Sequence, residues 1–140
     1  MEEANKKRDK ILKRIIEENE YCKTLGIEVI DVKEGYSKGR MKFDKKLCNP
    51  YGYIHGGCLY SFADVIAGIA ACSYSNYVCT ISGNMNYLKP AINTDYLYCE
   101  AEVIKHGKKI SYCNITITND EGDIVDNGTF NLYVLDQKVE

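Results

Sequence analysis

Residues 56–74 constrain the fold more than any other segment, because their pattern is that of a helix with apolar side chains on nearly every side. The segment is too short to cross a membrane, which takes about 20 predominantly apolar residues. Such a helix is stable only where other parts of the protein cover it. A chain of 140 residues can supply that cover within one domain, without disulfides or metals to hold it together.

The segments expected to cover the helix are strands, because they are short and rich in β-branched and aromatic residues that often alternate with polar ones. They are residues 26–32, 38–44, 77–88, 95–104, 109–118 and 128–135. A hairpin is expected between the first two, and the last two pairs should be antiparallel neighbours. Glu100 and Glu102 then face outward. Their neighbours Cys99, Ala101 and Val103 face the covered side.

The N-terminal residues 1–24 are predicted to form a helix with a narrow apolar stripe, which suits the surface of a core rather than its interior. The stripe consists of Ile11, Leu12, Ile15 and Ile16. No repeat, low-complexity segment or linker divides the chain, so we expect one domain over residues 1–140 with its core at residues 25–140. The expected class is α+β, with one long helix against one antiparallel sheet.

The charge balance argues against a nucleic-acid partner. The chain carries 18 lysines and arginines against 20 aspartates and glutamates, a formal net charge of -2, and lacks the basic excess that collects phosphates. It has no apolar run long enough for a membrane span, and its N-terminus lacks the apolar centre of a signal peptide. We therefore expect a cytoplasmic protein that does not associate with membranes.

The cysteines point to a reduced protein without a metal site. There are seven, an odd number, and none forms a CxxC pair. Most stand among apolar neighbours, which is typical of core residues rather than of a disulfide framework or a zinc site.

Asp64 is the unusual residue of the apolar helix. At about 100° per residue it lies nearly opposite the apolar face, beside Tyr60 and the small residues Ala67, Gly68 and Ala71. A carboxylate there needs a hydrogen bond or a cationic partner, or it holds its proton more tightly, because desolvating it alone costs several kcal/mol. It is either a general base beside a ligand or a structural residue that caps a neighbouring segment or pairs with a lysine.

The same helix begins with two poor helix formers, Gly56 and Gly57, directly after His55. The first N–H groups of a helix have no partner within it and carry its positive end. Without a Cβ in the way, a substrate carbonyl can rest against these N–H groups, which stabilise charge on its oxygen. Taken alone, however, a pair of glycines is more often a plain turn.

Three motifs together resemble the hotdog-fold acyl-CoA thioesterases of the phenylacetate-pathway and human thioesterase-superfamily type. They are NPYGYIHGG at residues 49–57, the aspartate nine positions after His55, and MNYLKPA at residues 85–91. Over residues 25–135, the order of the expected strands and helix also resembles that of this family. The resemblance implies a hotdog fold, in which an antiparallel sheet wraps one long helix. It also implies hydrolysis of an acyl-CoA to a free acid and coenzyme A, without a metal or redox cofactor.

The resemblance assigns the catalytic roles to four residues near the helix. Asp64 is expected to act as general base on water or to attack the thioester itself. The Gly56 N–H is expected to hold the thioester oxygen. His55 orients the loop and, with Asn49, helps to place the substrate carbonyl or the attacking water.

Further residues are expected around the substrate. Thr80, on the strand after the helix, matches a position at which relatives have a serine or threonine that positions the attacking water. Ser82 is the nearest other residue that could take this role. Gly57 and Tyr60 are expected to contact the substrate near the start of the helix. A tyrosine there suits an aromatic acyl group, but it is equally at home in an exposed strand or an interface.

The turn KHGKK contains Lys108 and Lys109, which either hold the phosphates of coenzyme A or form a solvated hairpin tip. His106 in the same turn is expected to be a solvated loop residue.

The resemblance implies a homodimer or a homotetramer with its active site at a dimer interface. Asn49 and His55 of one protomer would face Asp64 and Thr80 of the other, so that a monomer is inactive. The sequence does not distinguish the two assemblies.

Three alternatives stay open. Cys58 stands at the positive end of the helix, where the pKa of a thiol falls, and is a second candidate nucleophile. The domain is alternatively a non-catalytic acyl-CoA sensor, although a sensor does not need the helical carboxylate. A hydroxyacyl dehydratase is the third alternative, but relatives of that kind place their histidine and acid differently.

Overall fold

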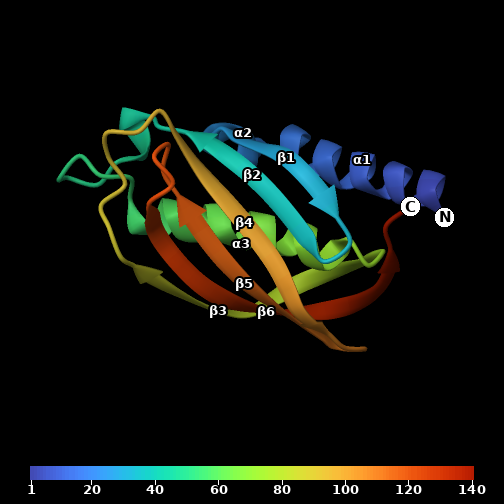
Figure 1. The fold of residues 1–140 in the computed structure, drawn as a ribbon. Coiled ribbons are helices and arrows are strands. Elements are labelled where there is room, and N and C mark those ends of the chain that lie inside the picture. Colours follow the sequence, from blue (N-terminus) through green and yellow to red (C-terminus); the bar gives the residue numbers. More distant parts are fainter.

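The computed structural model describes all residues 1–140 and shows a six-stranded sheet wrapped around one long helix (Figure 1). Its elements are α1 (Glu2–Glu18), α2 (Glu20–Leu25), β1 (Ile27–Lys33), β2 (Tyr36–Lys42), a short 3-10 helix (Lys45–Leu47), α3 (Gly56–Cys72), β3 (Asn76–Tyr87), β4 (Tyr96–His106), β5 (Ile110–Thr118) and β6 (Ile124–Lys138). The α+β class, the central helix and the six strands are confirmed, and β6 is longer than expected at both ends.

The strands lie in the order β1-β2-β4-β5-β6-β3, and all neighbours are antiparallel. β5 pairs with β4 on one side and with β6 on the other, as the sequence pattern predicted. Glu100 and Glu102 are exposed on β4, whereas Cys99 and Ala101 are fully buried. β3 is the last strand of the sheet, so its outer edge has no partner strand in this chain.

Helix α3 packs into the curve of the sheet. Its side chains Phe62, Ala63, Ile66 and Ala67 are wholly buried in the main core. On β2, a Cβ at Gly39 would collide with the side chain of Ile66, so glycine at this position lets the helix lie close to the sheet. The protein therefore covers its apolar helix as the sequence predicted. None of the helices has the length and apolar character that a membrane span requires.

The N-terminal segment forms two helices rather than the single one expected. Asn19 ends α1 and caps α2, because its Oδ1 accepts a hydrogen bond from the Cys22 N–H at 3.0 Å. An asparagine competes for backbone hydrogen bonds in this way, which breaks the helix there. α1 buries Leu12 against Ile69 of α3 and Val139 near the C-terminus.

One buried carboxylate was not anticipated from the sequence. Asp126 on β6 is fully buried, between Ile117 of β5 and Tyr87 of β3 in the register of the sheet. Neither of its carboxylate oxygens has a hydrogen-bond partner. Because burial disfavours the charged form, the pKa of Asp126 is raised to about 7.

Asp126 is expected to make the protein less stable as the pH rises. The group binds its proton more tightly when folded, so its stabilising contribution is complete below the unfolded pKa of about 3.9 and is lost as the pH rises through about 7. Asp126→Asn resembles the protonated form. We expect it to match the parent near pH 4 and to exceed its unfolding free energy by up to about 4 kcal/mol near pH 8.

Urea unfolding at a series of pH values measures this difference. Asp136→Asn, at an exposed position on the same strand, is the matched control and should follow the parent at every pH. Parallel pH profiles for Asp126→Asn and the parent would contradict the prediction.

Candidate functional site

The first turn of α3 leaves one backbone N–H group free. His55 caps the helix: its Nδ1 accepts a hydrogen bond from the Gly57 N–H at 2.9 Å. The His55 carbonyl accepts from the N–H groups of Cys58 and Leu59 at 2.9 Å and 3.1 Å. Only the Gly56 N–H has no acceptor in the chain. This donor, at the positive end of the helix, is available to a carbonyl oxygen from outside the protein.

His55 and Asn49 each add a free donor before the helix. Because His55 Nδ1 is an acceptor, the neutral ring carries its proton on Nε2, which has no partner in the chain. Asn49 uses its Oδ1 to accept from the N–H groups of Tyr51 and Tyr53 at 2.9 Å and 3.2 Å. Its amide Nδ2 stays unbonded. Asn49 thus shapes the loop that leads to His55, and the two N–H groups of its side-chain amide remain available as donors.

Asp64 and Thr80 meet in the structure. The Thr80 hydroxyl on β3 donates to Asp64 Oδ1 at 2.6 Å. Asp64 is half-buried, forms no ion pair, and has no partner for its second oxygen. The structural alternative, in which this carboxylate pairs with a lysine or caps a neighbouring segment, has no such contact to support it. One oxygen is held by a hydroxyl group, and the other is free to take a proton or to act as a nucleophile.

Tyr87 also contacts the start of α3, and sequence analysis gave this residue no role. Its hydroxyl donates to the Gly56 carbonyl oxygen at 2.9 Å. A Cβ on Gly56 would lie 3.2 Å from the Tyr87 ring, so the ring packs tightly against this glycine. Partial desolvation raises the pKa of Tyr87, whose hydroxyl is protonated at neutral pH in any case. Its position within the motif at residues 85–91 was the only signal in the sequence.

The two parts of the site open into different cavities. Gly56, Asn49 and Tyr87 line a cavity of about 340 Å³, whereas Asp64 and Thr80 line another of about 220 Å³. At 1.5 Å per residue, Gly56 and Asp64 are about 12 Å apart along the helix. One thioester group cannot contact both of them in a single chain.

Two other predicted residues make their contacts with β6 instead of with the Asp64 carboxylate. Tyr60 packs edge to face on Phe130, with 5.1 Å between ring centroids, and lines neither of these cavities. Ser82 accepts a hydrogen bond from Asn131 at 3.2 Å, so Thr80 rather than Ser82 contacts the carboxylate.

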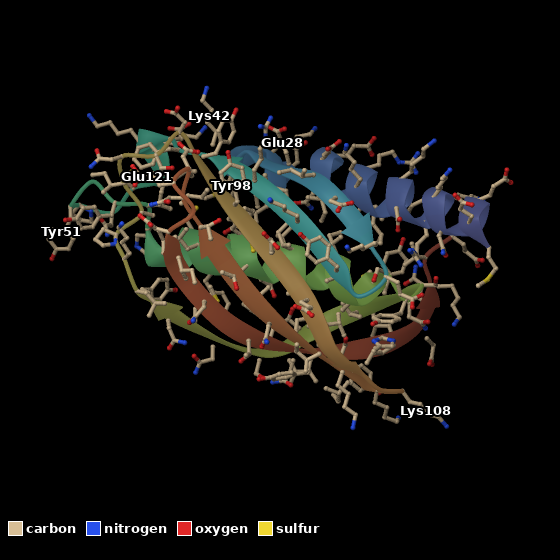
Figure 2. All side chains as sticks on the ribbon, in the orientation of Figure 1. Glu28, Lys42, Tyr51, Tyr98, Lys108 and Glu121 are labelled. Carbon is tan, nitrogen blue, oxygen red and sulfur yellow. The ribbon has the colours of Figure 1, made fainter.

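The predicted lysines lie far from the start of α3. Figure 2 shows Lys108 at the tip of the β4–β5 hairpin, at the opposite end of the molecule from Tyr51. Lys109 follows it and is also exposed. In a single chain these lysines are not brought to the loop that precedes His55.

Cys58 is poorly suited to be a nucleophile. Its side chain is buried against Met41, with 3.8 Å between the sulfur atoms, and burial raises the pKa of the thiol to about 11. Four more cysteines are buried, Cys48 is half-buried and Cys79 is exposed. The structure contains no group of three or more His, Cys, Asp and Glu side chains placed to hold a metal ion.

His106 was expected to be a solvated loop residue, and this was wrong. It ends β4, is half-buried, and stacks on Tyr74 with 4.0 Å between ring centroids. The aromatic partner comes from the turn after α3, far away in the sequence, so the local turn pattern did not reveal it.

Comparison with known proteins identifies the family and agrees with this fold. The thioesterase superfamily profile matches residues 51–125. The acyl-coenzyme A thioesterase PaaI of Escherichia coli is 30% identical over 105 residues, which cover 74% of this chain and 75% of that protein.

Solved structures support the same assignment. The E. coli PaaI structure has a TM-score of 0.90 and 24% identity, covers 97% of this chain and 99% of its own, and shows the fold. A thioesterase protein from Streptococcus pneumoniae TIGR4, solved with coenzyme A, has a TM-score of 0.77 at 29% identity, with 80% and 88% of the chains covered. This chain therefore belongs to the thioesterase superfamily of hotdog-fold thioester hydrolases.

Proposed function

We propose that this protein hydrolyses the thioester bond of an acyl-CoA, with Asp64 as the catalytic carboxylate and the Gly56 N–H as the donor to the thioester oxygen. The observation that carries the proposal is the hydrogen bond from Thr80 to Asp64. It fixes one carboxylate oxygen and leaves the other free beside an apolar cavity. A half-buried carboxylate without a cationic partner has no evident structural role, but it suits a general base or a nucleophile.

The proposed reaction uses groups of the protein and water. Asp64 takes a proton from a water molecule that attacks the carbonyl carbon, or attacks this carbon itself to form a mixed anhydride that water then opens. In both routes the Gly56 N–H and the positive end of α3 stabilise the charge that builds up on the carbonyl oxygen. In the general-base route the carbon–sulfur bond then breaks, and the coenzyme A sulfur takes the proton from Asp64 and leaves as a thiol. In the nucleophilic route this bond breaks as the anhydride forms, coenzyme A leaves as a thiolate, and the water that opens the anhydride supplies the proton. No step is assigned to a metal or a redox cofactor.

The relatives support coenzyme A as the leaving group. The E. coli protein is named an acyl-coenzyme A thioesterase, and the S. pneumoniae thioesterase protein was solved with coenzyme A. We keep Lys108 and Lys109 as candidates for its phosphates, because they are exposed and cationic.

Release of free thiol from a panel of aromatic and straight-chain acyl-CoAs tests the proposal directly. Turnover with at least one of them supports a thioesterase. Tight binding of acyl-CoA without any turnover would instead support a sensor and overturn the proposed activity.

We further propose that the working unit contains a dimer. Gly56 and Asp64 are too far apart along α3 to act on one thioester within one chain. An isologous pair of chains solves this, because the first turn of one α3 can then lie beside the carboxylate of the other. The edge of β3 supports such a pairing, since it is unpaired and exposes Cys79, Thr80, Ile81 and Ser82.

The dimer predicts that two inactive variants restore activity when they are combined. Asp64→Asn and Gly56→Pro damage different parts of the site. In a heterodimer of the two, one site carries both lesions and the other is intact, so we expect about half of the parent activity per dimer. Co-expression with two affinity tags isolates the heterodimer, and thiol release measures it. Activity no higher than that of the two separate variants would show that each site lies within one chain.

A further inference from the structure

The cavity beside Asp64 is largely apolar and is bounded by three elements. Leu12, Ile15 and Ile16 of α1 form one wall, and α3 and the start of β3 contribute most of the others. Nine of its twelve lining residues are hydrophobic, and its volume is about 220 Å³. Since Asp64 and Thr80 line the same cavity, a group attached to the reacting carbonyl carbon can extend into it.

Gly68 of α3 also lines this cavity, and nothing in the packing requires a glycine there. The residue lies within the helix, about one turn after Asp64, where glycine is a poor helix former. A Cβ at Gly68 would meet no atom within 4 Å. The absent side chain therefore leaves space inside the cavity rather than relieving a clash.

The wall formed by α1 lies outside residues 51–125, which match the family profile. Ile15 in this wall is 40% exposed, so its side chain stands between the cavity and solvent. The size of this cavity thus depends on a segment that the family profile does not cover.

We infer that this cavity receives the acyl group of the thioester, and that Gly68 and Ile15 limit the length of that group. This inference rests on the proposed function. An apolar cavity of about 150 Å³ holds a benzene molecule, so about 220 Å³ matches a phenylacetyl or octanoyl group, whereas a palmitoyl group would extend beyond it. The substrate class is an acyl-CoA with a single aromatic ring or a medium-length straight chain.

The test compares kcat/KM for butyryl-, octanoyl-, phenylacetyl- and palmitoyl-CoA in the parent and in variants of both walls. The parent should prefer octanoyl- and phenylacetyl-CoA over palmitoyl-CoA. Gly68→Leu fills the cavity from α3, and Ile15→Phe narrows it from α1. Each should lower the ratio of the kcat/KM for octanoyl-CoA to that for butyryl-CoA by about tenfold or more. A single methylene group that no longer fits an apolar pocket already changes the ratio of two substrates' kcat/KM values by about that factor. Gly68→Ala should change the ratio in the same direction by less.

Glu18→Phe is the matched control, because Glu18 is exposed on α1 and does not line this cavity. It should leave the octanoyl to butyryl ratio unchanged. Equal loss on all acyl chains in Gly68→Leu and Ile15→Phe would overturn the inference. If these two variants lose activity equally on all acyl chains and their molar mass in light scattering also differs from that of the parent, a second copy of the chain fills the cavity instead of an acyl group. If the parent hydrolyses none of the acyl-CoAs, the proposed function itself fails.

Discussion

Asp64→Asn is expected to lower kcat on the order of several hundredfold, because an amide can neither take a proton from water nor attack a carbonyl carbon. The substitution preserves the shape of the side chain. Its Oδ1 can still accept the hydrogen bond that Thr80 now donates to Asp64 at 2.6 Å. KM should change little, because the lost interaction belongs to the transition state rather than to substrate binding. Steady-state thiol release at equal concentrations of folded protein measures both constants.

Asp136→Asn provides the control for the loss of one negative charge. Asp136 is exposed on β6, makes no hydrogen bond or ion pair, and lies outside the site, so its variant should keep the parent's kcat. An Asp64→Asn variant that retains most of the parent's kcat would rule out this carboxylate as base or nucleophile. The alternative of a thiol nucleophile at Cys58 would then need to be tested by Cys58→Ala.

The elements near the site were predictable because their signals are local. The apolar pattern of α3, the glycines after His55 and the alternation on β4 are each contained in a short segment, and the structure confirms these elements. The same spacing placed Asp64 away from the main apolar face, where the structure leaves it half-buried. Local periodicity is therefore sufficient to predict which side chains of a helix or strand face the core and which face away from it.

The remaining features depend on residues that are distant in the sequence. Tyr87 contacts Gly56 only because β3 passes the start of α3, and no periodicity encodes that crossing. The burial of Asp126 follows from its position between β5 and β3, whereas its charge alone predicts an exposed side chain. The cavity beside Asp64 needs α1 to fold back over α3, and the stripe on α1 indicated a surface position without indicating which surface.

Gly56→Pro is expected to lower kcat by about a hundredfold to a thousandfold, the usual cost of losing one donor to a developing oxyanion. Proline lacks the N–H that Gly56 leaves free, and its ring also occupies the place of the bound oxygen. Position 56 is the first residue of α3, where a helix tolerates proline well. His55 has φ -57° and ψ 135°, a conformation that the residue before a proline adopts readily. The fold should therefore survive, and circular dichroism and the melting temperature verify this.

Gly56→Ala separates the lost donor from the added side chain. Both variants bring a Cβ to about 3.2 Å from the Tyr87 ring, which must shift by a few tenths of an ångström, but only alanine keeps the N–H. The ratio of kcat between the alanine and proline variants therefore reports the donor, with the crowding of Tyr87 largely cancelled. We expect alanine to retain most of the activity that proline loses. Equal losses in the two variants would mean that the space beside Tyr87, and not the N–H group, is what the reaction requires of Gly56.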